Sequence, residues 1–265
     1  MESIKDIIES SLKFKPGKVY PTGFEKLDAY LSGGLHNGVS LVSGRPAIGK
    51  TGFALGICHN LINNKMPAAY LGLNEPYQNL VKRFLCLRGL IEMDSLNQNL
   101  QYSESIANSM SEIDVMPFFF NDCSSYNIGD IINESIKLHR KRYVDVFIID
   151  SLPQLYFNTQ RSDKKLRPSI ILHELKYAAE KYKLSYVVIN GIKRQVEYRK
   201  NFRPALSDIL GDDFIEEMAD VVLLIFREKY YDPYASSHSE IILSKNKFGR
   251  TGTIDLDWDE NKLCF

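Results

Sequence analysis

The sequence has few cysteines, no long apolar run and no excess of charge of either sign. Its cysteines stand singly, without the C-x-x-C spacing of a zinc site or a redox pair, at Cys58, Cys86, Cys123 and Cys264. They argue against a zinc centre and favour a reduced, cytoplasmic protein. No stretch approaches about 18 consecutive apolar residues, so no membrane-spanning helix is predicted. The start, MESIKDIIESSLKF, lacks the basic and long apolar segments of a signal peptide.

The charges of the 265 residues balance, with 33 Lys and Arg against 33 Asp and Glu. No overall field therefore draws the protein to nucleic acid, and any such binding must come from local patches. Hydrophobic residues make up 44% of the chain, which supplies a sizeable core. The length suits one large α/β domain with a short appendage.

Short apolar runs alternate with longer amphipathic segments along most of the chain. The apolar runs predict strands at 39–43, 68–73, 117–122, 144–150, 185–190 and 220–226. The amphipathic segments predict helices at 51–62, 77–90, 103–113, 128–141, 168–183 and 212–219. Two further strands, 240–246 and 252–258, are expected as an antiparallel pair. The alternation predicts an α/β fold, with a mostly parallel, twisted sheet and helices on both faces.

An amphipathic helix is predicted ahead of this domain. Apolar residues recur on one helical face at Ile4, Ile7, Ile8 and Leu12. The segment KPGK, at 15–18, then ends the helix. We therefore expect residues 1–16 to form a helical appendage and residues 17–265 to form the main domain. The helix either packs on its own domain or docks on a neighbouring subunit.

The segment GRPAIGKT, at 44–51, fits the phosphate-binding pattern G-x-x-x-x-G-K-[ST] at every fixed position. Gly44 and Gly49 let the backbone turn so that successive N–H groups face phosphate oxygens. Lys50 is expected to reach the terminal phosphates, and the Thr51 hydroxyl to bind Mg²⁺. A chance match is disfavoured, because a predicted strand precedes the segment and a predicted helix follows it. The predicted nucleotide-binding residues of this loop are Gly44, Arg45, Pro46, Ala47, Ile48, Gly49, Lys50 and Thr51.

Asp150 is the expected second anchor for magnesium. It ends the apolar run VDVFIID, which is typical of a central parallel strand buried on both faces. Ligands of open α/β sheets bind at the carboxyl ends of such strands. Asp150 could instead simply terminate the strand, but the nearby phosphate loop favours the magnesium role. The predicted cofactors are ATP and Mg²⁺.

These segments resemble a known family. GRPAIGKTGFAL is similar to the phosphate loop of the DnaB-type replicative helicases, whose usual form is GRP-x-x-GKT-x-FAL. Further resemblances follow in order, with PTGFEKLDAYLSGGLHNG at 21–38, FIIDSLPQL at 147–155, RPALSDILGDDFIEEMADVVLLIFREKYY at 203–231 and SKNKFGRTGTIDL at 244–256. The resemblance implies a RecA-like P-loop NTPase fold.

The resemblance also implies partners. The family's proteins form a ring, usually a hexameric one, that holds ATP between neighbouring subunits and grips one DNA strand in its channel. The implied partners are therefore single-stranded DNA and further copies of the chain. The leading helix would be the family's linker helix, which packs on the adjacent subunit.

Two basic loops suit DNA binding by composition. The loop at 156–168 has four basic residues against one acid, and the loop at 192–204 has five against one. Basic side chains with interleaved aromatic residues neutralise phosphates and stack on bases. Each loop could instead be an ordinary solvated surface. The candidate DNA-binding residues are Arg161, Lys164, Lys165, Arg167, Lys193, Arg194, Arg199, Lys200 and Arg203.

The resemblance breaks at positions that matter for hydrolysis. The family's glutamate of S-L-E-M-P, which polarises the attacking water, is matched by Asn74 in GLNEP. Asparagine cannot accept the proton of the water, although it can orient the water. Glu75 is adjacent, but neighbouring residues of a strand face opposite sides. Glu75 substitutes only if the strand ends or bulges there, which Pro76 allows.

Three more family positions differ. The glutamine that senses the γ-phosphate is matched by Gly191, and the arginine of D-L-R by Leu210. The arginine that reaches the neighbour's ATP is matched by Lys247, with Lys245 two residues earlier. Lysine keeps the charge but lacks the planar guanidinium, which can bind two phosphate oxygens at once. Arg250 is an alternative donor to the neighbour's ATP. The candidate catalytic residues are thus Asn74, Glu75, Lys245 and Lys247. Together these changes predict slow or differently arranged hydrolysis.

Three hypotheses for function follow from these residues. The first is an ATP-dependent helicase or translocase core that acts on single-stranded DNA as a ring. The second is a nucleotide-binding interaction or regulatory protein that descends from a helicase core and is impaired in hydrolysis. The third is a RecA-, RadA- or KaiC-like ATPase, which the closing motifs of the chain disfavour.

Overall fold

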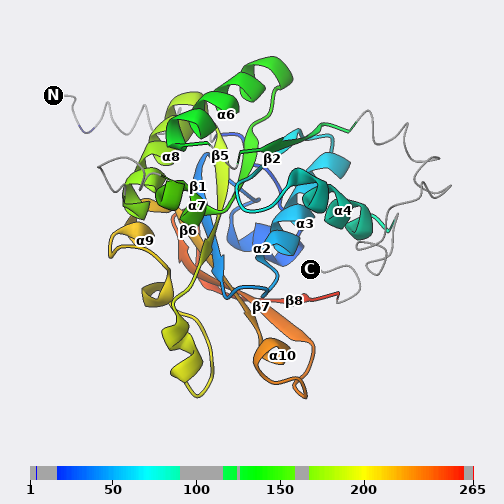
Figure 1. The fold of residues 1–265 in the computed structure, drawn as a ribbon, viewed down its shortest axis with the longest axis vertical. Coiled ribbons are helices and arrows are strands. Elements are labelled where there is room, and N and C mark those ends of the chain that lie inside the picture. Colours follow the sequence, from blue (N-terminus) through cyan, green and yellow to red (C-terminus); the bar gives the residue numbers. More distant parts are fainter. Residues whose placement is uncertain (1–3, 5–16, 90–115, 124–125, 159–166, 260–264) are drawn as a thin grey trace.

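The computed structural model describes residue 4 and residues 17–89, 116–123, 126–158, 167–259 and 265. In this part of the chain, one sheet has the strand order β3-β2-β4-β5-β1-β6-β7-β8 (Figure 1). The strands are β1 Gly38–Gly44, β2 Ala68–Gly72, β3 Phe118–Asp122, β4 Val146–Asp150, β5 Ser185–Gly191, β6 Val221–Arg227, β7 His238–Asn246 and β8 Gly252–Asp257.

The first six strands run parallel, and the last two close the sheet as an antiparallel pair. The strands β1, β2 and β4 are buried along their whole length, as expected for strands covered on both faces. Gly44 of β1 pairs with Gly191 of β5, and Gly72 of β2 pairs with Asp150 of β4. The parallel register therefore brings the strand ends that precede the functional loops to one edge of the sheet.

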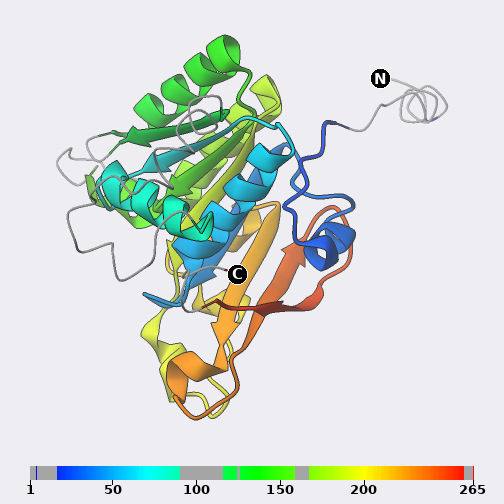
Figure 2. The same ribbon diagram turned by 90° about the vertical axis from the view of Figure 1, so that its right-hand side faces the viewer.

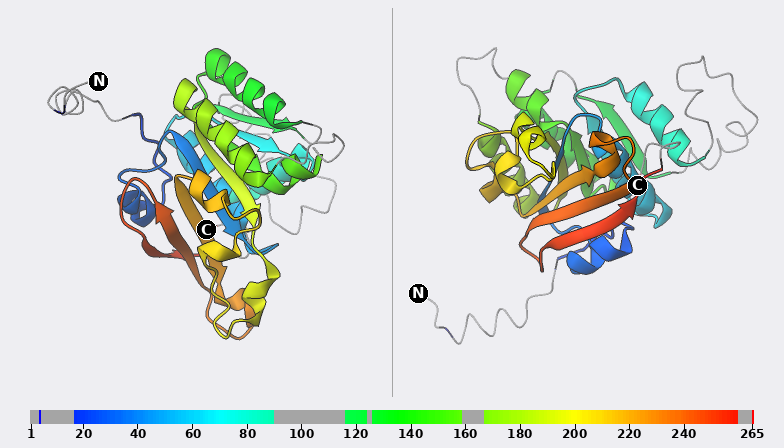
Figure 3. Two further views of the ribbon diagram at one scale, coloured as in Figure 1. Left: turned by 90° about the vertical axis from the view of Figure 1, so that its left-hand side faces the viewer. Right: turned by 90° about the horizontal axis from the view of Figure 1, so that it is seen from below.

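Helices cover both faces of the sheet. The helices are α2 Glu25–Tyr30, α3 Lys50–Asn63, α4 Tyr77–Leu87, α6 Ile128–Arg142, α7 Leu152–Asn158, α8 Pro168–Tyr182, α9 Ile215–Met218 and α10 Glu228–Tyr231. Helices α2, α3 and α4 pack into one hydrophobic core, which includes Phe53 and Phe84. Helices α6, α7, α8 and α9 pack into a second core on the opposite face, which includes Phe147 and Leu175. Figures 2 and 3 show the two layers with the sheet between them.

Local sequence explains where several of these helices begin and end. Asn127 caps α6 by accepting a hydrogen bond from the Asp130 amide, and the Asp130 carboxylate accepts one from the Asn127 amide. Pro168 occupies the first turn of α8, where its missing N–H is not needed. Four basic or histidine residues fill the last turn of α6, which suits the negative end of the helix dipole.

The predicted α/β class, the parallel sheet and the closing antiparallel pair are confirmed. The predicted strands and helices in the described residues agree with the observed bounds to within a few residues. Sequence analysis missed α2, α7 and α10 and two 3₁₀ helices, η3 Arg194–Tyr198 and η4 Leu206–Asp208. The predicted helices at 1–16 and 103–113 lie outside the described residues, residue 4 excepted. Among the described helices, none is long and apolar enough to cross a membrane.

The predicted loop at 156–168 is partly wrong. Its first residues, 156–158, belong instead to helix α7, which follows the strand that ends at Asp150 and continues to Asn158. Leu152 and Leu155 of α7 are buried in the second core, so apolar contacts hold this segment as a helix. Its far end, Arg167, is an exposed residue that precedes α8. The middle of the loop, with Arg161, Lys164 and Lys165, lies outside the described residues.

Candidate functional site

The phosphate loop connects β1 to α3 in a conformation that requires glycine at Gly49. This residue precedes α3 with a φ of 116°, in the left-handed region that side chains disfavour. A Cβ atom at Gly49 would also lie 2.6 Å from the Trp258 ring. Gly49 thus lets the loop turn directly into α3, whose N-terminus favours anions.

Lys50 is held over the mouth of this loop. Its Nζ donates to the carbonyl oxygens of Gly44, at 3.0 Å, and Arg45, at 2.8 Å. Burial lowers the pKa of Lys50 to about 8; the Asp150 carboxylate opposes this shift, and the Arg45 charge adds to it. The ammonium lies among carbonyl dipoles, so a phosphate oxygen can compete for it.

Mg-ATP affinity is expected to fall as the pH rises above about 8. Lys50 has a lowered pKa of about 8, so below this pH it already carries the proton that phosphate binding requires. Above it, binding must take up a proton, and Kd should rise about tenfold per pH unit. Calorimetry in two buffers of different ionisation enthalpy measures this uptake. A constant affinity from about pH 7 to about pH 9.5 would contradict the assignment of Lys50.

The predicted magnesium ligands lie together. Thr51 Oγ1 donates to Asp150 Oδ2 at 2.8 Å, and the same oxygen accepts from the Tyr70 hydroxyl at 2.6 Å. Asp150 is 8% exposed, and Tyr70 is fully buried. Hydroxyl and carboxylate oxygens are hard donors that suit Mg²⁺, which normally completes its shell with phosphates and water. No cluster of three or more His, Cys, Asp or Glu residues competes as a metal site in the described part of the chain.

One cavity joins the phosphate loop, the magnesium ligands and the start of the second basic loop. Its lining comes from the ends of β1, β4 and β5, from the start of α3 and from loop residues that include Asn74, after β2, and Leu210. The lining residues are Gly44, Arg45, Pro46, Ala47, Lys50, Thr51, Asn74, Asp150, Ser151, Pro153, Ile189, Asn190, Gly191, Ile192, Lys193, Arg194 and Leu210. Thus all but two of the predicted nucleotide-binding residues line it; the exceptions are Ile48, which is buried, and Gly49.

The structure separates Asn74 from Glu75. Strand β2 ends at Gly72, so neither residue is held by strand geometry. Asn74 is exposed, lines the cavity and accepts a hydrogen bond from Gln154 Nε2 at 2.9 Å. Glu75 does not line the cavity, and its Oε2 lies 3.8 Å from an Arg83 nitrogen. Burial raises the pKa of Glu75, while the Arg83 charge lowers it. Asn74 is therefore the better placed of the two to meet a water beside the phosphates.

The two other altered positions on this side of the sheet are neighbours. A Cβ atom at Gly191 would lie 3.4 Å from Leu210 Cδ2, and the Leu210 amide donates to the Gly191 carbonyl at 3.0 Å. The two positions that the sequence analysis matches to the family's sensing glutamine and arginine thus adjoin in the cavity wall. Beside them, Asn190 donates to the Leu210 carbonyl, and its buried Oδ1 has no hydrogen-bond partner. Asn190 is a polar group of the cavity that was not among the predicted site residues.

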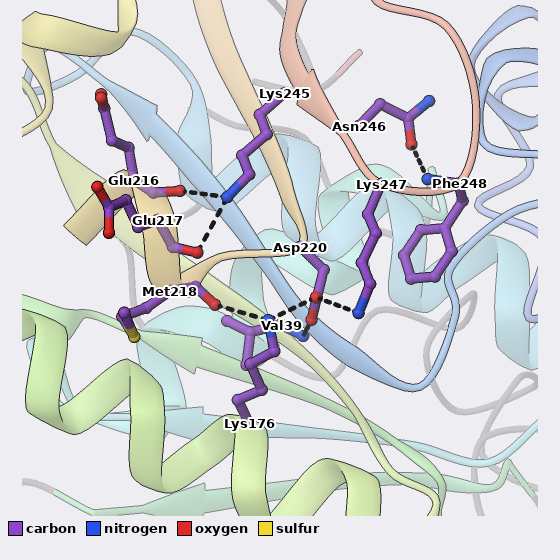
Figure 4. A network of polar contacts seen from close by, with 10 residues as sticks. All are labelled: Val39, Lys176, Glu216, Glu217, Met218, Asp220, Lys245, Asn246, Lys247 and Phe248. Atoms are coloured by element: carbon purple, nitrogen blue, oxygen red, sulfur yellow. Dashed lines mark hydrogen bonds and ion pairs between the residues drawn. The ribbon is translucent and has the colours of Figure 1, made fainter. Parts of the chain in front are cut away.

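Lys245 and Lys247 lie at the opposite edge of the sheet from their own phosphate loop. Lys245 pairs with Val222, near the start of β6, and this part of β6 lies beside the first half of β1. Lys245 Nζ donates to the carbonyls of Glu216, at 2.7 Å, and Glu217, at 3.0 Å (Figure 4). Burial and the Lys176 charge lower the pKa of Lys245. Both lysines therefore lie away from the phosphate loop of their own chain.

Asp220 anchors Lys247. Lys247 Nζ lies 3.3 Å from Asp220 Oδ1, and Lys176 Nζ lies 2.7 Å from the same oxygen (Figure 4). The other oxygen, Oδ2, accepts from the Val39 amide at 3.1 Å. A Cβ atom at Gly38 would lie 2.4 Å from Oδ2, which explains the glycine there. Buried Asp220 thus links β1, α8 and the segment that carries Lys247.

The second basic loop is less available than its composition predicts. Arg199 forms two hydrogen bonds with the Asp208 carboxylate, and Arg203 pairs with Glu240. Lys193 Nζ donates to the Ser207 carbonyl at 3.1 Å. These contacts hold the segment against η4 and β7. Among the predicted DNA-binding residues within the described ranges, three keep exposed side chains without such contacts: Arg167, Arg194 and Lys200.

The model of the DnaB-like helicase C terminal domain family matches residues 20–265. The chain is similar to the replicative DNA helicase DnaB of Geobacillus stearothermophilus, with 29% identity over 96% of this chain and 60% of the relative. It is also 29% identical to the replicative DNA helicase DnaC of Bacillus subtilis, over 89% of this chain and 54% of that protein. The chain thus spans slightly more than half the length of these relatives.

Solved structures show the same fold. One of them, described as an ATPase domain, has a TM-score of 0.86 and 23% identity, and covers 99% of this chain and 98% of its own. A DnaB-like replicative helicase, solved in a study of its interactions with primase, has a TM-score of 0.84 and 22% identity, covering 100% of this chain and 67% of its own. A KaiC-like protein from Pyrococcus horikoshii has a lower TM-score, 0.65, at 13% identity, and it covers 94% of this chain and 98% of its own. The resemblance found in the sequence is confirmed, and the chain belongs to the DnaB-like helicase C-terminal domain family.

Proposed function

We propose that the chain is the ATP-dependent motor core of a DNA helicase or translocase, acting on single-stranded DNA as a ring in the cytoplasm. The observation that carries this proposal is the shared cavity, in which the phosphate loop and Asp150 lie beside the first residues of a basic loop. Nucleotide and DNA would then meet on one edge of the sheet. Family membership supports the same function.

Each residue has a role in this proposal. Lys50 and the amides at the start of α3 bind the β- and γ-phosphates. Thr51 and Asp150 hold Mg²⁺, which neutralises developing charge on the phosphates when bound. Asn74, fixed by Gln154, orients the attacking water. Because it accepts the proton poorly, turnover should be slow.

Lys245 and Lys247 would act on the nucleotide of the neighbouring subunit. This role requires that the ring place this edge of the sheet, where both lysines lie, against the next subunit's phosphate loop. Lys247 would have to leave Asp220, which retains Lys176 as its partner at 2.7 Å. Asp220 would therefore remain paired when Lys247 moves.

The second candidate, a nucleotide-binding protein impaired in hydrolysis, is favoured by one observation. The water-orienting position is Asn74, and the sensing position and its neighbour are Gly191 and Leu210. Both candidates predict nucleotide binding, and they differ in turnover. The KaiC-like alternative has only its fold in common with this chain.

Removal of the exposed positive charges should reduce the salt dependence of DNA binding. In an Arg194→Gln/Lys200→Gln double variant without nucleotide, the slope of log Kd against log salt should become shallower by about 1.4, because each single-strand phosphate contact contributes about 0.7. Fluorescence anisotropy with a labelled oligonucleotide at several salt concentrations measures the slope. The matched control is Lys141→Gln/Arg142→Gln, which removes two exposed charges at the opposite edge of the sheet. Equal slopes in the two double variants would exclude the loop as the DNA contact.

A further inference from the structure

Arg45 belongs to the phosphate loop, but its side chain turns away from the phosphates toward the second basic loop. Its Nε donates to Glu197 Oε1 at 2.8 Å, and its Nη2 lies 2.6 Å from the same oxygen. Its Nη1 donates to the Ile192 carbonyl at 3.3 Å. In the described part of the chain, every side-chain hydrogen bond between residues 44–51 and residues 192–204 comes from Arg45.

Burial makes this contact costly to break. The Arg45 side chain is 10% exposed, and that of Glu197 is 40% exposed. If Glu197 moved away alone, a nearly buried guanidinium would lose its carboxylate, which is a strongly unfavourable state. The phosphate loop and the segment that carries Glu197 should therefore move together.

The phosphate side of Arg45 is sensitive to nucleotide. Its carbonyl oxygen accepts a hydrogen bond from Lys50 Nζ at 2.8 Å. A phosphate group competes for the same ammonium, because a charged acceptor makes a stronger hydrogen bond than a carbonyl does. Nucleotide binding thus changes the hydrogen bonding of the peptide group of Arg45 itself.

The other end of the contact lies in a segment that is fixed on both sides of an exposed aromatic residue. Glu197 belongs to η3, where Val196 is fully buried and Arg199, just beyond, is held by Asp208. Tyr198, between the two held residues, is 87% exposed. An exposed aromatic ring beside exposed Lys200 is the combination that binds single strands by stacking and charge.

We propose that the Arg45–Glu197 ion pair is a positioning contact that couples nucleotide occupancy to the single-strand affinity of residues 192–204. This inference rests on the proposed function, since it needs both ligands to bind. Gly191 gives it a physical reason, because the cavity wall has no side chain there that could connect the phosphates to the loop. Glu197 acts through Arg45 and touches neither ligand.

The test compares Glu197→Gln with the unmodified chain. The Kd of a non-hydrolysable ATP analogue with Mg²⁺ is measured with and without a single-stranded oligonucleotide, and the Kd of the oligonucleotide with and without the analogue. For each ligand, the Kd without the other ligand is divided by the Kd with it. In the unmodified chain this ratio should be about 5-fold or more, and it should be the same for the analogue and for the oligonucleotide. In Glu197→Gln the ratio should approach 1, while each ligand alone binds within about threefold of the unmodified chain.

Two further variants make the test specific. Glu228→Gln makes the same chemical change at an exposed residue of the adjacent α10, and it should keep the full ratio. Arg45→Lys keeps the charge but lacks the planar guanidinium, so it should lower the ratio, and a double variant that also carries Glu197→Gln should show the same ratio as Glu197→Gln alone.

The outcomes separate the inference from the function on which it rests. If the unmodified chain fails to bind the analogue or the oligonucleotide, the proposed function is wrong. If it binds both without coupling, or if Glu197→Gln and Arg45→Lys retain the full ratio, the inference is overturned and the proposed function stands.

Discussion

A Lys50→Ala protein should bind Mg-ATP at least about 100-fold more weakly than the unmodified chain, because hydrogen bonds from charged groups contribute about 1.5–3 kcal/mol each and Lys50 can donate several. In the structure its ammonium already lies among the carbonyls of the loop, 2.8 Å from the Arg45 oxygen. The phosphates would therefore meet it without a large movement of the side chain. Isothermal titration calorimetry with ATP and Mg²⁺ measures the change.

The control for this experiment is Lys141→Ala, which removes an exposed lysine at the far edge of the sheet. It should bind nucleotide as the unmodified chain does. Both variants should keep a cooperative thermal unfolding transition, since neither removes a buried apolar side chain. If Lys50→Ala binds Mg-ATP within about tenfold of the unmodified chain, which is about 1.4 kcal/mol, the phosphate loop is not the nucleotide site.

An Asn74→Glu variant should hydrolyse ATP about 100-fold faster or more, the low end of what general base catalysis contributes. Asn74 lines the cavity beside Asp150, and a glutamate there could accept the proton of the attacking water. Gln154 already donates to this position at 2.9 Å and could hold the new carboxylate. A coupled assay of phosphate release at saturating Mg-ATP measures turnover, while the affinity for nucleotide should change little.

Glu75→Gln is the matching test of the adjacent carboxylate. Glu75 lies beside Arg83 and outside the cavity lining, so its loss should leave turnover nearly unchanged. The assignment of Asn74 as the water-orienting residue would be wrong if Glu75→Gln abolished turnover and Asn74→Glu left it unaltered.

The sequence was most informative where function depends on contiguous residues. The phosphate loop is eight consecutive residues whose turn and helix start are set locally, so its position and conformation can be predicted from the sequence alone. Asp150 could be placed as well, because a buried parallel strand fixes where its last residue lies. Parallel register then explains why Thr51 and Asp150 meet, although 99 residues separate them.

Contacts between distant segments could not be predicted. Glu197 is 152 residues from Arg45, and a single acid in a basic loop gives no sign of its partner. The same applies to the anchoring of Arg199 by Asp208 and of Arg203 by Glu240, which reduces the charge available to DNA. Counting basic residues predicts a patch, but pairing within the fold decides how much of it can reach a phosphate.

Helix α7 shows how burial overrides local composition. The basic residues at 156–168 indicate a loop, and no helix is predicted between Asp150 and this segment. Leu152 and Leu155 are instead buried against the second core, and these contacts hold the chain as a helix as far as Asn158. One consequence is that Gln154 lies where it can fix Asn74.

The most direct test of the proposed motor is the steady-state rate of ATP hydrolysis by the unmodified chain, with and without single-stranded DNA, against Lys50→Ala as background. We expect a slow rate that lies above the background and rises when DNA is added, because the phosphate loop, Asp150 and the exposed Arg194 of the basic loop line one cavity. A chain that binds Mg-ATP but shows no turnover above Lys50→Ala, at any DNA concentration, would contradict the motor and leave nucleotide binding without hydrolysis.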